Sequence, residues 1–436
     1  MDPMWVGVIG IIVLLTLIAF GAHIAIALGL TGAVGLIFVA GIDGAVASLA
    51  SLAHYKVASF SLTVIPLFVM MGMLASESGV TSKLFNVLQL WTGRLRASLS
   101  VATAAGCTVF GTVCGSSLVT AALFAKTAAP EMRQRGYDKK FSYAICSAAG
   151  TIGMLIPPSI LIVIYGINSG DSIAKLLIGG ITPGLLLFIV FSIGSIVMAY
   201  LNPSLAPAIR TETTWGQRLK SLPSFWPFVL MMGIIVGGLF SGLWSPEETG
   251  AVGALFMFLI FIGSRQRSWQ RLKSAMFDTI ATSAMIFLIL IGGGLFARFL
   301  TMSGVTTSFL NLVVGSGLEA TAFVIAAAGV YIALGCFFDG ISMTVITLPI
   351  FYPVVTALGI DPIYFAMVAI LAMHVGPITP PVGLNVYAVK GVAEADVSLE
   401  DLFRGVMPYF IMMLVALAII IAFPAMSTYL PNLMVN

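Results

Sequence analysis

The chain has 436 residues, of which 59% are hydrophobic and 8% are charged, and its formal net charge at pH 7 is +3. A soluble domain carries roughly 25% charged residues, so this composition excludes an ordinary soluble protein. Continuous apolar runs of spanning length, about 17–25 residues, recur from end to end, which predicts an all-α polytopic membrane protein surrounded by lipid.

The predicted elements of the first half follow one another without long soluble segments. The N-terminus has no basic n-region and no small-residue cleavage site, so we interpret it as a first helix and not as a signal peptide. Residues 98–131 are too short to span twice and are rich in Gly, Ser, Thr and Ala, which indicates a re-entrant hairpin. In chain order we expect spans near 4–20, 24–41 and 62–77, an amphipathic stretch at 81–97, the hairpin, a broken span at 141–167 and a closing span at 176–200.

Short sequences recur at an offset that drifts only between 218 and 225 residues. TGAVG occurs at 31–35 and 249–253, and Gly115-Ser116-Ser117 corresponds to Gly340-Ile341-Ser342. Five crossings plus a hairpin make an odd number, so the second half must insert upside down, which is an inverted repeat. We predict a first repeat at 1–205 (scaffold helices 1–97, hairpin and broken helix 98–167, closing helix 176–200), a cytoplasmic linker at 206–221, and a second repeat at 222–436 (scaffold helices 222–318, hairpin and broken helix 320–390, closing helix 403–424).

The positive charges are consistent with this topology. With the N-terminus outside, every Lys and Arg falls on the inner side except Lys56, Lys175 and Arg298. This distribution obeys the positive-inside rule, and it predicts that both termini lie on the outer, periplasmic side. The first hairpin then enters from the cytoplasm, and the second, about 320–357, enters from the opposite face.

Two double prolines break helices at matching places in the two halves. They lie in GMLIPPSIL (153–161) and GPITPPVGL (376–384), each with a glycine four positions before the first proline. Irregular backbone at membrane depth is tolerated only where protein or a water-filled cavity surrounds it. Exposed carbonyl and hydroxyl oxygens suit Na⁺, and the positive N-terminal ends of half-helices suit an anion. We therefore expect two Na⁺ sites, one per half, on either side of one anion site, with no transition metal and no other cofactor.

The candidate ligands are the oxygen-bearing residues of the hairpin tips and breaks. Ser and Thr in membrane helices also bond to their own backbone as packing contacts, and that reading stays open for each hydroxyl. For the first site we predict Ser116, Ser117, Thr120, Gly153, Pro157 and Ser159, and for the second Asp339, Gly340, Ser342, Thr344, Thr379, Pro380 and Asn385. For the substrate we predict Gly115, Ser117, Ser159, Asn385 and Arg298.

Three ionisable residues need separate interpretation. Asp339 lies in the second hairpin, where a carboxylate is costly and usually marks an ion pathway, although a protonated or carbonyl-paired structural acid is the alternative. Arg298 either reaches toward the membrane interface or contacts the anionic substrate or a partner. His374 is expected to be a hydrogen-bonded structural residue.

At these residues the sequence resembles the large membrane subunit of tripartite ATP-independent periplasmic (TRAP) transporters, the DctM or SiaM type. FGTVCGSS, GMLIPPSI, FFDGISMTVITLPIFYPV and GPITPPVGLNVY carry the resemblance in order and spacing, and Cys114 stands where a smaller residue such as serine is expected. The resemblance implies a bacterial inner-membrane, Na⁺-driven importer of organic acids with an elevator mechanism. It also implies two partners, a small four-helix membrane subunit (DctQ or SiaQ type) and a periplasmic substrate-binding protein (DctP or SiaP type).

Other classes of protein are less well supported. A self-sufficient ion-coupled carboxylate or anion transporter of similar build is the nearest alternative. The sequence has neither the H-E-x-x-H nor the G-x-S-G motif of intramembrane enzymes, no P-loop, and no basic arm typical of nucleic-acid binding. A plain channel has no need for two symmetry-matched cation sites. C4-dicarboxylates, sialic acids, other sugar acids and sulfonates all remain candidate substrates.

Overall fold

The computed structural model describes residues 2–93, 96–207 and 214–434, and these segments are helical with no strand among them. The helices up to residue 201 are α1 (Pro3–Ala19), α2 (Ile24–Val57), α3 (Val64–Glu77), α4 (Val80–Thr92), α5 (Ser98–Cys114), α6 (Ser117–Gln134), α7 (Lys139–Ala149), α8 (Ile160–Ser169), α9 (Ile173–Gly179) and α10 (Ile181–Leu201). The later ones are α11 (Trp215–Ser221), α12 (Trp226–Phe240), α13 (Pro246–Gly263), α14 (Trp269–Met302), α15 (Val305–Gly315), α16 (Ala320–Gly335), α17 (Gly340–Ala357), α18 (Pro362–Val375), α19 (Leu384–Val392), α20 (Leu399–Ala422) and α21 (Ala425–Asn432).

Among the described residues, seven helical segments are long and apolar enough to cross a membrane, and a bent helix pair, Trp215–Ser224 with Trp226–Phe240, makes up to eight. Several shorter apolar helices accompany them, including one arm of each broken span and one arm of each hairpin. The predicted fold class is therefore confirmed: this is an all-α polytopic membrane protein with re-entrant hairpins and broken helices.

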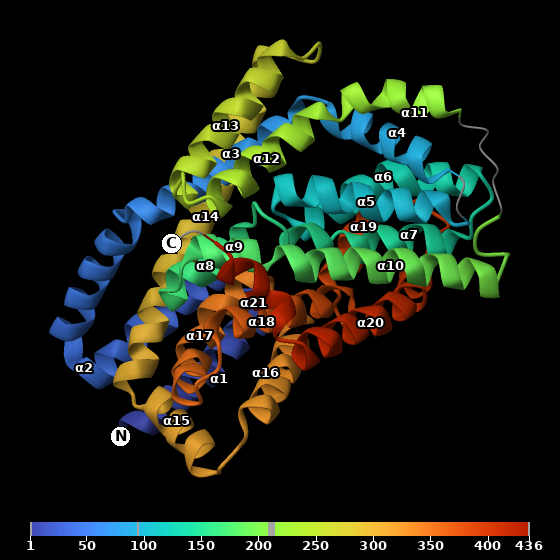
Figure 1. The fold of residues 1–436 in the computed structure, drawn as a ribbon. Coiled ribbons are helices and arrows are strands. Elements are labelled where there is room, and N and C mark those ends of the chain that lie inside the picture. The colour runs from blue at the N-terminus through green and yellow to red at the C-terminus, as the bar shows by residue number, and fades with distance from the viewer. Residues whose placement is uncertain (1, 94–95, 208–213, 435–436) are drawn as a thin grey trace.

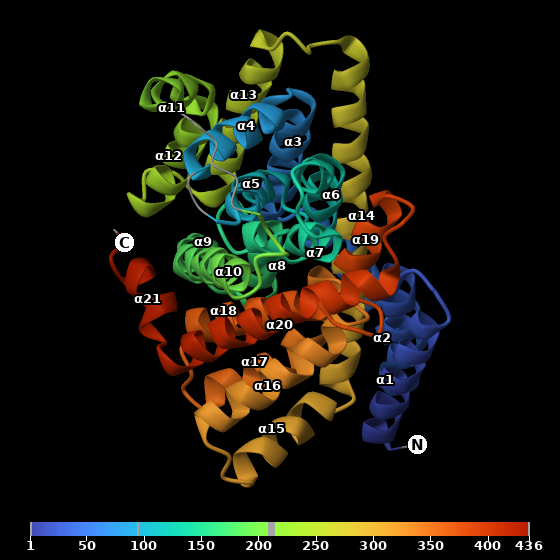
Figure 2. The same ribbon diagram turned by 90° about the vertical axis from the view of Figure 1, so that its right-hand side faces the viewer.

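The helices form two groups that lie side by side in Figures 1 and 2. One group, which we name the scaffold, contains α1–α3 and α12–α14, and α2 packs along most of α14. Small residues allow this approach, because a side chain at Gly32 would meet the backbone of Phe296 and one at Gly292 would meet the backbone of Ala25. The other group, which we name the hairpin block, contains α5–α10 and α16–α21.

Each half contributes one helical hairpin to the block. The first hairpin is α5 and α6, which pack on each other and meet at Gly115 and Ser116, and the second is α16 and α17, which meet at residues 336–339. Gly115 has a φ of 65°, a left-handed conformation that glycine adopts without a Cβ penalty. The hairpins predicted at 98–131 and 320–357 are thus present, within three residues at each end.

Each hairpin is followed by a helix that breaks at a double proline. In the first half α7 ends at Ala149, a 3₁₀ turn covers Ile152–Met154, and α8 starts at Ile160. In the second half α18, a 3₁₀ turn at Gly376–Ile378 and α19 repeat that order. Proline lacks the amide hydrogen that a continuous helix needs, so the chain stays irregular at both places.

Some elements differ from the sequence-based expectation. The second span does not stop near residue 41, because α2 kinks at Gly41, where φ is 75°, and continues to Val57. The amphipathic stretch expected at 81–97 forms a helix only to Thr92; Leu84 on its apolar face is fully buried, whereas Trp91 remains 39% exposed. Leu95 lies outside the described residues, as do 208–213 of the predicted linker, which otherwise contains α11.

Candidate functional site

A cavity of about 380 Å³ lies where the hairpin block faces the scaffold. Both hairpin tips and both helix breaks line it from the block, and α3 and α14 line it from the scaffold. Its lining consists of Val69, Met73, Cys114, Gly115, Ser116, Ser117, Leu118, Val119, Met154, Ile160, Thr282, Met285, Ile286, Asp339, Gly340, Ile341, Met373, His374, Pro377, Leu384 and Asn385.

The first hairpin tip presents neutral oxygens. Ser116 is the N-cap of α6, and its hydroxyl accepts a hydrogen bond from the amide of Val119 at 3.4 Å. The buried Thr120 hydroxyl donates to the carbonyl of Ser116 at 2.8 Å. In the adjacent break, the Ser159 hydroxyl caps α8 by accepting from the amide of Ile162 at 3.3 Å, and it donates to the carbonyl of Met154. Each of these hydroxyls is therefore held by the local backbone.

The second hairpin tip has the same construction with a carboxylate added. Asp339 is the N-cap of α17, and its Oδ2 accepts hydrogen bonds from the amides of Ile341 and Ser342 at 3.0 and 3.3 Å. Its Oδ1 accepts a short hydrogen bond from the Ser342 hydroxyl. Thr344 donates to the carbonyl of Gly340 at 2.8 Å, as Thr120 does to Ser116 in the first half. Three hydrogen bonds therefore hold the Asp339 carboxyl group at the start of α17.

A buried asparagine in the cavity lining joins the two halves. Asn385, at the start of α19, accepts a hydrogen bond from the Ser117 hydroxyl at 3.1 Å. Its amide group donates to the carbonyl of Ser147 on α7 at 3.2 Å. The residue has no exposed surface, so it links the first hairpin and the first broken helix to the second broken helix.

Close glycine contacts hold each break against its own hairpin. A Cβ at Gly111 would lie 2.9 Å from the Cα of Gly153, and one at Gly335 would lie 3.0 Å from the Cα of Gly376. Gly153 and Gly376 are the glycines that precede the double prolines, each of which contains a cis peptide bond. The glycines thus allow backbone-to-backbone contact between hairpin and break in both halves, a role that the sequence pattern did not reveal.

The structure places the predicted site residues in two layers. Six of them line the cavity, namely Gly115, Ser116, Ser117, Asp339, Gly340 and Asn385. The others on the tips and breaks are outside the lining: Thr120, Gly153, Pro157, Ser159, Ser342 and Thr344 are buried, Thr379 is half-buried with its hydroxyl donating to the carbonyl of Val375, and Pro380 is exposed.

Arg298 is not brought to the cavity. It lies on the exposed surface of α14 and is absent from the cavity lining, so the structure gives no contact between it and the predicted substrate position. An exposed Arg on a helix near the membrane boundary fits the interfacial alternative, because its long side chain reaches water while the stem covers apolar surface.

Sequence reasoning missed the scaffold side of the cavity. Val69 and Met73 of α3, and Thr282, Met285 and Ile286 of α14, face the hairpin tips. They belong to ordinary apolar spans, and no local pattern distinguishes them from lipid-facing residues. Methionine is common on both sides of the cavity, where its flexible thioether can adapt to different neighbours.

The ionisable side chains in the cavity lining are Cys114, Asp339 and His374. The lining contains neither Lys nor Arg. His374 is buried, and its Nδ1 lies 2.6 Å from the carbonyl of Ile370, which places a proton on that nitrogen. An anion in this cavity would meet helix N-termini and any bound cation, with no Lys or Arg side chain to pair with. The chemistry therefore favours binding of an anion together with a cation.

The chain is similar to known proteins along nearly its whole length. The family model described as "Tripartite ATP-independent periplasmic transporter, DctM component" matches residues 11–426. The C4-dicarboxylate TRAP transporter large permease protein DctM of Pseudomonas aeruginosa is 31% identical over 93% of each chain, and the ectoine TRAP transporter large permease protein TeaC of Halomonas elongata is 29% identical over 86% of each chain. Among solved structures, the Alcanivorax borkumensis YdaH transporter superposes with a TM-score of 0.65 at 15% identity, covering 97% of this chain and 98% of that one, which shows similarity of fold.

Proposed function

The chain belongs to the DctM family, the large permease subunits of tripartite ATP-independent periplasmic transporters, and from this premise we propose that it imports an organic acid by Na⁺-coupled secondary active transport. The single observation that carries the proposal is the cavity between two equivalent hairpin tips. It combines one carboxylate, hydroxyl and carbonyl oxygens and helix N-termini, and its lining contains neither Lys nor Arg.

Two Na⁺ ions are the cations that we place in this site. Threonine and carbonyl oxygens recur at equivalent positions of the two tips, through Thr120 with Ser116 and Thr344 with Gly340. Hard oxygen ligands suit Na⁺, and two sites follow from the repeat. The ions would supply the positive charge that an anionic substrate needs, so substrate and Na⁺ would bind together.

The proposed transport movement is of the elevator type. The cavity lies at the boundary between the hairpin block and the scaffold, so displacement of the block along α3 and α14 would carry the bound substrate across the membrane. The lining on the scaffold side is largely apolar, as expected for a surface along which another surface slides. In this mechanism both termini are periplasmic and the protein resides in the inner membrane of a bacterium.

The proposed partners are a small membrane subunit of the DctQ or SiaQ type and a periplasmic substrate-binding protein of the DctP or SiaP type. The substrate is an organic acid such as a C4-dicarboxylate or a sialic acid, or a related carboxylate or sulfonate. Relatives named for C4-dicarboxylates and for ectoine have similar identity to this chain, so the level of identity does not choose among the substrates.

The experiment is uptake into proteoliposomes that contain the chain with the small subunit and binding protein encoded beside it. Succinate, ectoine, N-acetylneuraminate and isethionate are tested as labelled probes under an inward Na⁺ gradient. We expect uptake of one probe that requires both the gradient and the binding protein, and no uptake when K⁺ replaces Na⁺.

Two results would contradict the proposal. Uptake that is equally fast in a K⁺ gradient would exclude coupling to Na⁺. Uptake by the chain alone, without binding protein or small subunit, would instead favour a self-sufficient anion transporter.

A further inference from the structure

Two acidic residues outside the cavity occupy equivalent positions in the two halves. Asp171 follows α8 and Asp396 follows α19, and they are 225 positions apart, as are Pro183 in α10 and Pro408 in α20. Each acid therefore lies just after the half-helix that leads away from a double-proline break.

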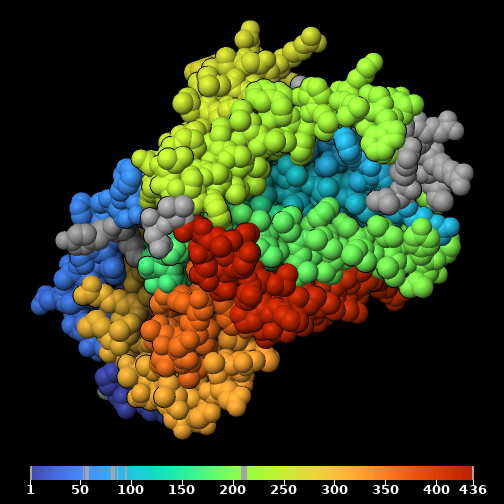
Figure 3. Space-filling view, viewed as in Figure 1, coloured from blue at the N-terminus to red at the C-terminus, as the bar shows by residue number. Residues whose placement is uncertain are grey.

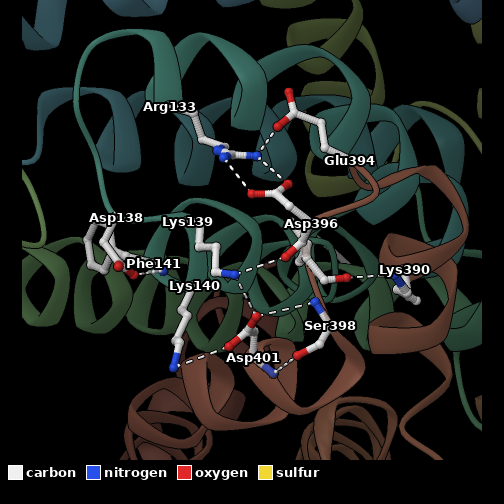
Figure 4. A network of polar contacts seen from close by, with 11 residues as sticks. Arg133, Asp138, Lys139, Lys140, Phe141, Lys390, Glu394, Asp396, Ser398 and Asp401 are labelled. Atoms are coloured by element: carbon white, nitrogen blue, oxygen red, sulfur yellow. Dashed lines mark hydrogen bonds and ion pairs between the residues drawn. The ribbon is translucent and has the colours of Figure 1, made fainter.

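Each of these acids is bound by the hairpin of the other half. Arg133, near the end of α6, donates to the two carboxylate oxygens of Asp396 at 2.9 and 2.8 Å, and it also contacts Glu394 (Figure 4). Tyr352, near the end of α17, donates its hydroxyl to Asp171 Oδ1 at 2.6 Å. The first hairpin is thus bonded to the second half, and the second hairpin to the first half.

The two contacts lie at opposite ends of the hairpin block. Asp396 is three residues before the start of α20, whereas Asp171 is beside α9, which packs on α21 beyond the other end of α20. The 24 residues of α20 rise about 36 Å, which is the thickness of a membrane. Both tips therefore lie between the two contacts, and each contact is made at the open end of a hairpin.

We propose that Arg133 and Tyr352 are positioning residues that fix the two hairpin tips at the shared cavity by clamping each hairpin to the opposite half. This inference rests on the proposed function, because the purpose of the two contacts would be to keep the two half-sites aligned during transport. We name the Arg133–Asp396 contact the first clamp and the Tyr352–Asp171 contact the second clamp.

The clamps differ in chemistry. The first clamp is a bidentate ion pair supported by Lys139, which donates to the carbonyl of Asp396 at 2.9 Å and pairs with Asp401 at 2.9 Å (Figure 4). The second clamp is a single hydrogen bond from a phenol to a carboxylate. Since a bidentate charged pair is stronger than one hydrogen bond, the second hairpin is the one held more weakly.

Native cysteines report on each tip separately. Cys114 lies at the first tip and is 8% exposed, and Cys336 lies at the second tip and is 7% exposed. We expect Tyr352→Phe, which removes only the hydroxyl, to accelerate maleimide labelling of Cys336 about tenfold, since labelling follows local opening. Arg133→Gln should accelerate labelling of Cys114, and Arg133→Lys should partly restore the protection because it keeps the charge and loses the bidentate geometry.

Matched controls remove similar bonds within one half. Tyr364→Phe loses a hydroxyl bond to the carbonyl of Ile421 at 3.1 Å, and Arg404→Gln loses the ion pair with Glu400 on the same helix. Both controls should leave the labelling of Cys114 and Cys336 at the wild-type rate. Equal acceleration in controls and clamp variants, or acceleration at the wrong tip, overturns the proposal, as does wild-type labelling in both clamp variants.

Transport kinetics supply the second readout. In the reconstituted complex, both clamp variants should raise the apparent KM for substrate and Na⁺ more than they lower the rate at saturation. The labelling is measured without transport, so absence of uptake by the wild-type complex would contradict the proposed function while the labelling still tests the clamps.

Discussion

The two hairpin tips have the same backbone construction and different charges. At the first tip a serine, Ser116, caps α6, and at the second an aspartate, Asp339, caps α17. Thr120, the fourth residue of α6, and Thr344, the fifth residue of α17, each donate a hydrogen bond to the carbonyl four residues earlier. The repeat therefore preserves the geometry of an oxygen-rich tip, while the charge is concentrated in one half. We infer that the cation site of the second half depends on a carboxylate and that of the first half on neutral oxygens.

The largest expected effect follows from removing that charge. Asp339→Asn keeps a good helix cap, so the protein should fold and insert as the wild type does. Na⁺-dependent uptake should fall about 10- to 100-fold, as expected for the loss of interactions with a charged group worth about 1.5–3 kcal/mol. Ser116→Ala at the equivalent position should reduce uptake by less than this. Substrate uptake by the Asp339→Asn variant at the wild-type rate would show that Asp339 is not part of the site. It would also show that the two tips do not differ in their dependence on a charged residue.

The next effect tests what the two halves share. Gly153→Ala and Gly376→Ala each place a methyl group against the backbone of the neighbouring hairpin, at Gly111 and Gly335 respectively. Overpacking of this kind costs about 1–3 kcal/mol, so both variants should have a lower unfolding midpoint in detergent. Gly329→Ala, in α16 where a Cβ would meet nothing within 4 Å, is the matched control. A wild-type midpoint for both variants would show that the close contacts are not maintained.

An effect of similar size, divided between stability and binding, is expected where the halves meet. Asn385→Ala leaves the Ser117 hydroxyl and the carbonyl of Ser147 without their partner. Buried polar groups that lose a partner cost about 1–3 kcal/mol, and here part of that cost should appear as weaker substrate and Na⁺ binding because Asn385 also lines the cavity. Asn311→Ala on the exposed surface of α15 should change neither stability nor uptake. A stability loss without any change in apparent KM would assign Asn385 to packing alone.

The elements that could be predicted from sequence are those with a strong local signal. Double prolines cannot continue a helix, a run rich in Gly, Ser, Thr and Ala indicated the first hairpin, and the repeat indicated the second, both at nearly the observed bounds. The six cavity-lining residues that were predicted came from the same segments, because chemistry and irregular backbone coincide there.

The remainder depends on tertiary contacts that leave no local pattern. Met73 and Met285 look like any apolar residues of a span, and only the packing of scaffold against block places them at the cavity. The continuation of α2 past Gly41 was missed because the expected span ended near residue 41, where the helix kinks at a glycine with a φ of 75° and then continues to Val57. The pairing of Arg133 with Asp396 joins residues more than 260 positions apart, which no periodicity within a half could indicate.

The smallest expected effect concerns acid. The hydrogen bonds and charge of Arg133, with a contribution from the charge of Lys139, lower the pKa of Asp396 below its usual value near 3.9. Arg133 also forms an ion pair with Glu394. Because the folded-state pKa is lowered, the first clamp stabilises the protein fully above about pH 4 and loses that contribution as the pH falls through the folded value. Asp396→Asn should therefore lower the unfolding midpoint slightly at pH 7, and the difference from the wild type should shrink below about pH 4. High salt should reduce it too, since the Asp396 side chain is about half exposed. A difference that is independent of both pH and salt would show that the first clamp is not ionic and would remove the contrast in chemistry between the clamps of the two hairpins.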